Sequence, residues 1–351
     1  MSDLSTIVTV NIDVQTQSIA RTAFGIPAVL GQFATSKTTP AFSRARTYTS
    51  TDEMIDEGWL TTDPVYKHVA SMFAQNPRPS TVVVGRRDSG DADWTAALAA
   101  IRAEDDSWYT FVFEPTTVPT TDTEIEEIGA WVLTQKKIAF VQSSTAGIYD
   151  PASTTDVLYN LRANGRMALM YRAAARLGDC SPAAWLGEGL PWPIGSSQWA
   201  YKTLAGSLGD TLSSAQKQGV HGKNGNTYAI RGGVEVTERG KVTNGEWLDV
   251  VFGLDWLEAN LQEEVYSALV NTRKISYDDA GILVITGIVQ KVLETAGRNG
   301  VLQLSSISVS APKYADIATA DKQARKLPNV TFRALLQGAI LTTEIRGTVS
   351  L

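Results

Sequence analysis

The sequence predicts an α+β domain formed by both chain ends, with an α/β domain inserted between them. Strand-like patterns lie at the two ends, and strand-like and helix-like segments alternate in the middle of the chain. At 351 residues the chain is also too long for one ordinary core and fits two domains. We therefore expect residues 1–22 and 225–351 to form the first domain, and residues 23–224 to form the inserted one.

The first strand is predicted over residues 6–14. Its apolar residues alternate with polar ones, which places them on one face of a strand: Val8, Val10, Ile12 and Val14.

The C-terminus shows the same period twice. The first run has Val330, Phe332, Ala334 and Leu336; after a turn at 337–338, the second has Leu341, Thr343, Ile345, Gly347, Val349 and Leu351. Chain ends fray unless something holds them, so these strands need a sheet to join. That sheet can belong to the same chain or, through strand addition at an exposed edge, to a neighbouring copy.

The middle of the chain predicts a parallel α/β layer covered by helices on both faces. Expected strands cover residues 81–85, 108–113, 137–142 and 167–171, and expected helices cover 64–74, 93–103, a segment opening at 121, and 156–163. Residues 181–245 are rich in glycine, proline and tryptophan, with short strands at 227–231 and 234–238. Two amphipathic helices follow, one over 247–269 and one from Asp278 to a stop at Gly297.

Composition excludes several classes of protein. The net charge of −6 argues against nucleic-acid binding, which needs a basic face. No apolar run approaches the length of a membrane helix, and the N-terminus lacks the pattern of a signal peptide, so we expect neither a membrane partner nor export from the cytoplasm. The single cysteine, Cys180, rules out an internal disulfide, and the two histidines, His68 and His221, lie far apart in the sequence.

Motifs that carry chemistry are incomplete. Residues 219–225 approach a phosphate-binding loop, but Asn224 replaces the metal-binding hydroxyl and Lys217 the first glycine. Residues 205–209 approach the serine-nucleophile turn, with Ala205 in place of its first glycine. A catalytic Cys180 would need a histidine partner, so a buried thiol is the better interpretation. We expect no catalytic, cofactor-binding or metal-binding residues.

The order of several segments resembles the phage contractile-tail sheath proteins, and the likeness covers nearly the whole chain. The segments that carry it are residues 22–31, 46–53, 63–66, 70–79, 274–281, 327–332 and 336–340. The resemblance implies an inner domain built from both chain ends, an exposed inserted domain, and terminal arms exchanged between neighbours as added strands. Val8 to Val14 and Leu341 to Leu351 would then pair across subunits.

The resemblance also implies a structural function in the phage tail, in a virion assembled in the host cytoplasm. The chain would polymerise helically around the tail tube and contract to drive the tube through the host envelope, with baseplate and tail terminator proteins as further partners. Lys322, Arg325 and Lys326 would face the tube, although a solvated helix end explains them nearly as well. The alternatives are a tail tube or baseplate subunit, or an α/β enzyme whose site escapes recognition.

Overall fold

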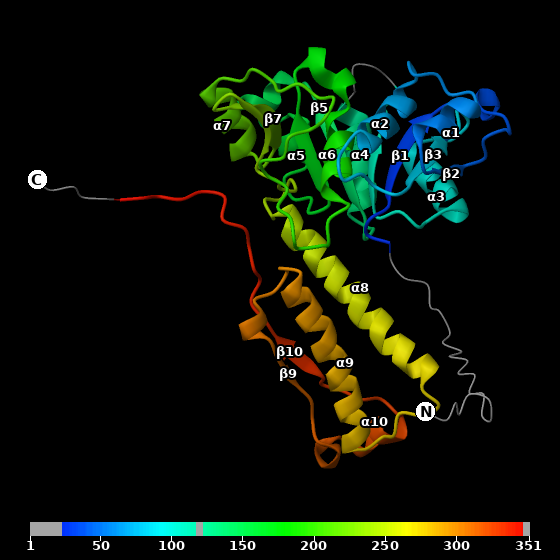
Figure 1. Ribbon diagram of the computed structural model, residues 1–351, viewed down its shortest axis with the longest axis vertical. Helices are drawn as coiled ribbons and strands as arrows, with labels where there is room; N and C mark the ends of the chain where they lie inside the picture. Colours follow the sequence, from blue (N-terminus) through cyan, green and yellow to red (C-terminus); the bar gives the residue numbers. More distant parts are fainter. Residues whose placement is uncertain (1–22, 117–121, 347–351) are drawn as a thin grey trace, which may run out of the picture.

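The computed structural model describes residues 23–116 and 122–346. A large sheet with helices on both faces forms one part, and a helical hairpin with a small sheet forms the other (Figure 1). The strand expected over residues 6–14 lies outside the described residues, as do Val349 and Leu351 at the other end.

The large sheet has eight strands in the order β2-β3-β1-β4-β5-β6-β7-β8. The strands are β1 (Pro27–Gln32), β2 (Ala45–Tyr48), β3 (Val82–Arg87), β4 (Thr110–Phe113), β5 (Ile138–Ser143), β6 (Met167–Tyr171), β7 (Asn226–Arg231) and β8 (Val234–Glu238). The six central strands are parallel, and β2 and β8 pair antiparallel at the two edges. The expected parallel layer is confirmed, as are its four predicted strands; β1 and β2 were not predicted.

Helices cover both faces of this sheet (Figure 1). On one face lie α2 (Pro64–Phe73), α6 (Ser181–Gly189) and the start of α8; on the other lie α3 (Trp94–Glu104), α4 (Asp122–Val132), α5 (Val157–Asn160) and α7 (Ser214–Gly222). A short helix, α1 (Thr51–Asp56), follows β2. Alternate strand residues enter the two cores, so Val82 and Val84 pack on one side and Val83 on the other. The predicted helices are confirmed, with α5 shorter than expected.

The second part contains the two long helices predicted from periodicity, α8 (Leu248–Asn271) and α9 (Asp279–Arg298). After them come β9 (Ser308–Ser310), α10 (Thr319–Gln323) and β10 (Thr331–Arg333). Leu257 of α8 packs with Val289, Leu293 and Ala296 of α9 in a separate small core. The Asp278 side chain accepts a hydrogen bond from the Gly281 N–H at the start of α9.

Helix α9 corrects one expectation. It is long and apolar enough to cross a membrane by length and composition, so the statement that no segment reaches this length is wrong. One such helix is weak evidence for a membrane span, because core helices pass the same test. Here Val289, Val292, Leu293 and Ala296 of α9 are buried in the small core.

Helix α8 joins the two parts. Leu248 and Phe252 at its start are buried in the core of the large sheet, and the rest of the helix carries the hairpin. By sheet membership, β7 and β8 belong with the α/β layer, whereas the expected division between residues 224 and 225 would separate them from it.

Candidate assembly interface

The C-terminal segment begins as part of the small core. Strand β10 pairs antiparallel with β9, with Phe332 opposite Val309. The chain then follows residues 301–306: the Gln303 N–H donates to the Leu335 carbonyl at 2.8 Å, and the Gln337 N–H donates to the Val301 carbonyl at 2.9 Å. The run predicted over 330–336 therefore forms a strand only at residues 331–333.

Residues 338–342 lie beside the start of α8, and the segment then projects from the molecule (Figure 1). The Tyr201 hydroxyl donates a 2.9 Å hydrogen bond to the Leu341 carbonyl. Leu341 also lines a pocket of about 280 Å³ with Trp247 and Tyr201. Ile340 and Ile345 are each 88% exposed. Residues 341–346 pair with no strand among the residues that the structure describes.

The small sheet beside this segment has only β9 and β10 within the described ranges. All three residues of β10 are exposed, including Phe332. A two-stranded sheet is marginally stable in water, and its outer N–H and C=O groups are a template for a further strand. This sheet therefore has room for strands from elsewhere.

The basic residues expected to face a tube lie together at the end of α10. The Lys322 ammonium sits 4.4 Å from the centre of the Tyr314 ring. Arg325 has a left-handed backbone, with φ of 54°, and the Lys326 carbonyl accepts a 2.6 Å hydrogen bond from the Tyr277 hydroxyl. Their contact with a tube remains a prediction.

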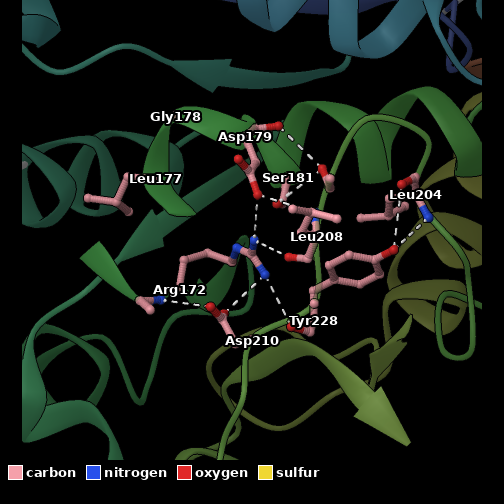
Figure 2. A network of polar contacts seen from close by, with 12 residues as sticks. Arg172, Leu177, Gly178, Asp179, Ser181, Leu204, Leu208, Asp210 and Tyr228 are labelled. Carbon is pink, nitrogen blue, oxygen red and sulfur yellow. Dashed lines mark hydrogen bonds and ion pairs between the residues drawn. The ribbon is translucent and has the colours of Figure 1, made fainter. Parts of the chain in front are cut away.

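The carboxyl ends of the parallel strands are where ligands usually bind in this kind of sheet. Here the chain's own polar groups occupy part of that edge (Figure 2). The fully buried Arg172 guanidinium lies 3.0 Å from Asp210 and 3.3 Å from Asp179, and it donates to the Leu208 and Tyr228 carbonyls. Burial lowers the pKa of Arg172 and raises the pKa of Asp210. The two terminal nitrogens of Arg172 thus have partners within the protein, whereas its buried Nε has no hydrogen-bond partner among the described residues.

A second buried cluster brings together residues that lie far apart in the sequence. His68 Nε2 lies 2.9 Å from Glu114, and the Cys180 thiol neighbours the same imidazole. Burial lowers the pKa of His68, but the nearby Cys180 and Glu114 outweigh it and raise this pKa to about 10. Both His68 and Cys180 are only 4% exposed, which leaves no room for a substrate. Cys180 is the buried thiol that was expected, although it does have a histidine neighbour.

The two incomplete motifs also serve internal contacts. Lys223 donates to Asp156 at 2.6 Å and to the Gly147 carbonyl at 2.8 Å, so its ammonium is engaged inside the protein. Ser207 is buried, and its hydroxyl donates to the Asp179 carbonyl. No group of three or more His, Cys, Asp and Glu side chains that could hold a metal occurs in the part of the chain that the structure describes.

Comparison with known proteins points to one class. Residues 248–306 match the family described as E217 tail sheath protein gp31-like, C-terminal domain. The fold is similar to a chain in the cryo-EM structure of the anti-feeding prophage baseplate, with a TM-score of 0.63, 12% identity and 98% of each chain covered. It is also similar to the sheath tail protein Lin1278 from Listeria innocua, with a TM-score of 0.55, 10% identity, and 85% of this chain and 90% of that chain covered. No curated protein sequence matches the chain.

The chain thus has a mixed α/β fold similar to that of a sheath tail protein. Residues 248–306 belong to the family of E217 gp31-like tail sheath C-terminal domains, and the described chain has the fold of a sheath tail protein. The resemblance seen in the sequence is confirmed, and this family is structural rather than enzymatic.

Proposed function

We propose that this chain polymerises with copies of itself into a helical sheath around a tail tube, joined by strands exchanged between subunits. The observation that carries the proposal is the C-terminal segment. Its apolar Ile340 and Ile345 lie in water, its backbone beyond residue 341 has no strand partner among the described residues, and an incomplete sheet lies close to where it leaves.

Strand exchange would supply backbone hydrogen bonds both to the open β9–β10 sheet and to the segment that joins it. The β9–β10 sheet offers open edges, and a strand added there gains backbone hydrogen bonds while its apolar alternate face sets the register. The proposed donors are residues 8–14 and 341–351 of neighbouring copies. In this arrangement the two chain ends form the inner, lattice-building domain, as expected for residues 1–22 and 225–351, and residues 23–224 form the outer one. Strands β7 and β8 are the exception, because they belong to the large sheet and so to the outer domain.

Contraction is then a change of packing. Subunits leave an extended, metastable lattice for one with more favourable contacts, while the exchanged strands keep neighbours attached. The movement drives the tube through the host envelope. In this proposal the basic residues after α10 face the tube, and the baseplate and tail terminator proteins bind the two ends of the sheath.

The test compares the full chain with versions lacking residues 1–15 or 341–351, by negative-stain electron microscopy. We expect tubes from the full chain and none from either truncation. A full-length control replaces Thr342 or Thr343 singly by proline. Adjacent N–H groups of a strand point to opposite sides, so one proline removes a ladder hydrogen bond and the other does not. Small discrete oligomers from the full chain, or tubes from both truncations, would contradict the proposal.

A baseplate subunit is the second candidate, because a chain of similar fold occurs in the anti-feeding prophage baseplate structure. A baseplate role predicts closed rings of fixed subunit number, whereas a sheath role predicts tubes of variable length. The same micrographs distinguish the two.

A further inference from the structure

An apolar pocket of about 290 Å³ lies at the end of the hairpin remote from the large sheet. Its walls come from α8, α9 and the segments next to them: Val265, Leu269, Ile275, Tyr277, Ile282, Ile285, Arg325, Leu327 and Val330. Leu269 at its mouth is 55% exposed. Most of this lining is aliphatic, so the pocket suits a branched aliphatic side chain.

The chain has such side chains in its projecting C-terminal segment, where Ile340 and Ile345 are 88% exposed. They cannot reach the pocket of their own copy. Leu341 is held beside Trp247, at the start of α8, whereas Leu269 lies 22 residues further along that helix, about 33 Å away. Four extended residues carry Ile345 only about 14 Å from Leu341.

A further feature matches the segment to the pocket. Val330 lines the pocket and directly precedes β10, so a strand added at the edge of the β9–β10 sheet passes its mouth. In such a strand Ile345 lies on the same face as Leu341, and Glu344 lies on the opposite face, toward solvent.

We propose that Ile345 of one copy inserts into this pocket of a second copy. The inference rests on the proposed assembly and names its contact residues. Ile345 acts as the apolar anchor of the exchanged strand, and its alternate face sets the register.

The test is a disulfide between two full-length chains of different mass. One chain carries Ile345→Cys and the other Leu269→Cys; the matched control replaces Leu283, which lies on α9 outside the pocket lining and is 71% exposed. Under mild oxidation we expect the Leu269 pair to link at least about ten times more than the Leu283 pair, because the proposed contact holds residue 345 within disulfide distance of residue 269 and away from residue 283.

Equal linking of the Leu269 and Leu283 pairs would overturn the inference. A disulfide within one chain that carries both Ile345→Cys and Leu269→Cys would also overturn it. So would selective linking of a chain carrying Val10→Cys to a chain carrying Leu269→Cys, because the N-terminal segment would then occupy the pocket. If deletion of residues 341–351 abolishes tubes while the two pairs link equally, the pocket assignment fails and the proposed assembly stands. If the full chain forms no tubes, the proposed assembly fails.

Discussion

Besides the buried Leu248 and Phe252, one carboxylate holds α8 against the large sheet. Asp255 accepts a hydrogen bond from the Tyr109 hydroxyl and a two-point contact from the Arg166 guanidinium, whose Nη2 lies 3.0 Å from Asp255 Oδ1. The side chain of Asp255 is 9% exposed and that of Arg166 is 23% exposed. Burial and the adjacent Asp255 raise the pKa of Tyr109 well above its usual value, so the phenol stays protonated and donates.

Asp255→Asn should therefore destabilise the protein strongly. The new asparagine amide has only one acceptor oxygen, although donors approach from both Arg166 and Tyr109. Its NH₂ group, itself a donor, then faces either the guanidinium or the phenol. Breaking a buried ion pair costs about 3–5 kcal/mol, and because Arg166 reaches solvent we expect about 2–4 kcal/mol here. Tyr109→Phe removes one hydrogen bond and keeps the ion pair, so it should cost about 1 kcal/mol.

Urea unfolding gives the change in free energy, and hydrogen exchange locates it. The amides in the first half of α8 should exchange faster in Asp255→Asn. The matched control is Glu258→Gln, one turn further along α8, where Glu258 pairs with Lys136 and both side chains are about half exposed or more. That exposed pair should contribute no more than about 1 kcal/mol. Equal effects of Asp255→Asn and Glu258→Gln would refute the reasoning from burial.

Three further predictions concern the α/β layer. Arg172→Met should cost about 3–5 kcal/mol in urea unfolding because Asp210 is left buried without its cation, and adding Asp210→Leu should recover most of the loss. The folded pKa of His68, about 10, lies above its ordinary 6.5, so its contribution is complete below about pH 6.5 and is lost as the pH rises toward 10. The stability difference between wild type and His68→Gln should shrink over that range, and a constant difference would contradict the pairing. Gly187→Ala would place a Cβ 2.6 Å from the Met72 carbonyl oxygen, so it should separate α6 from α2 and cost about 1–3 kcal/mol, measured by thermal unfolding.

The pattern of apolar residues within a single segment predicted the strands and helices that are covered in the same way along their whole length. Strands β3, β4, β5 and β6 are short apolar runs because both of their faces are covered by helices, and α8 and α9 show a helical period because one side packs. Strand β1 has the same buried character, but its partners β3 and β4 lie 50 or more residues away in the chain. Strand β2 has four residues at a sheet edge, with Arg46 among them, and offers little pattern to detect.

The candidate interface was predictable only in part. The alternation through Leu341 and Ile345 indicated a strand in need of a sheet, and that segment projects with Ile345 exposed. The pocket near Arg325 is assembled from α8, α9 and the chain before β10, so no single segment signals it. The contact between His68 and Cys180 likewise joins residues 112 positions apart and follows only from tertiary structure.

The two kinds of contact in this chain separate folding from assembly. Asp255 acts inside one copy, where a buried ion pair fixes α8 against the sheet, so its loss should lower stability with or without neighbours. The segment beyond residue 341 is exposed, and its Ile345 contributes nothing to its own core. Proline at Thr342 or Thr343 should therefore leave urea unfolding of a single copy unchanged while one of the two abolishes tubes. A proline variant that lost both stability and tubes would mean that this segment packs within its own copy, and strand exchange would then be the wrong explanation.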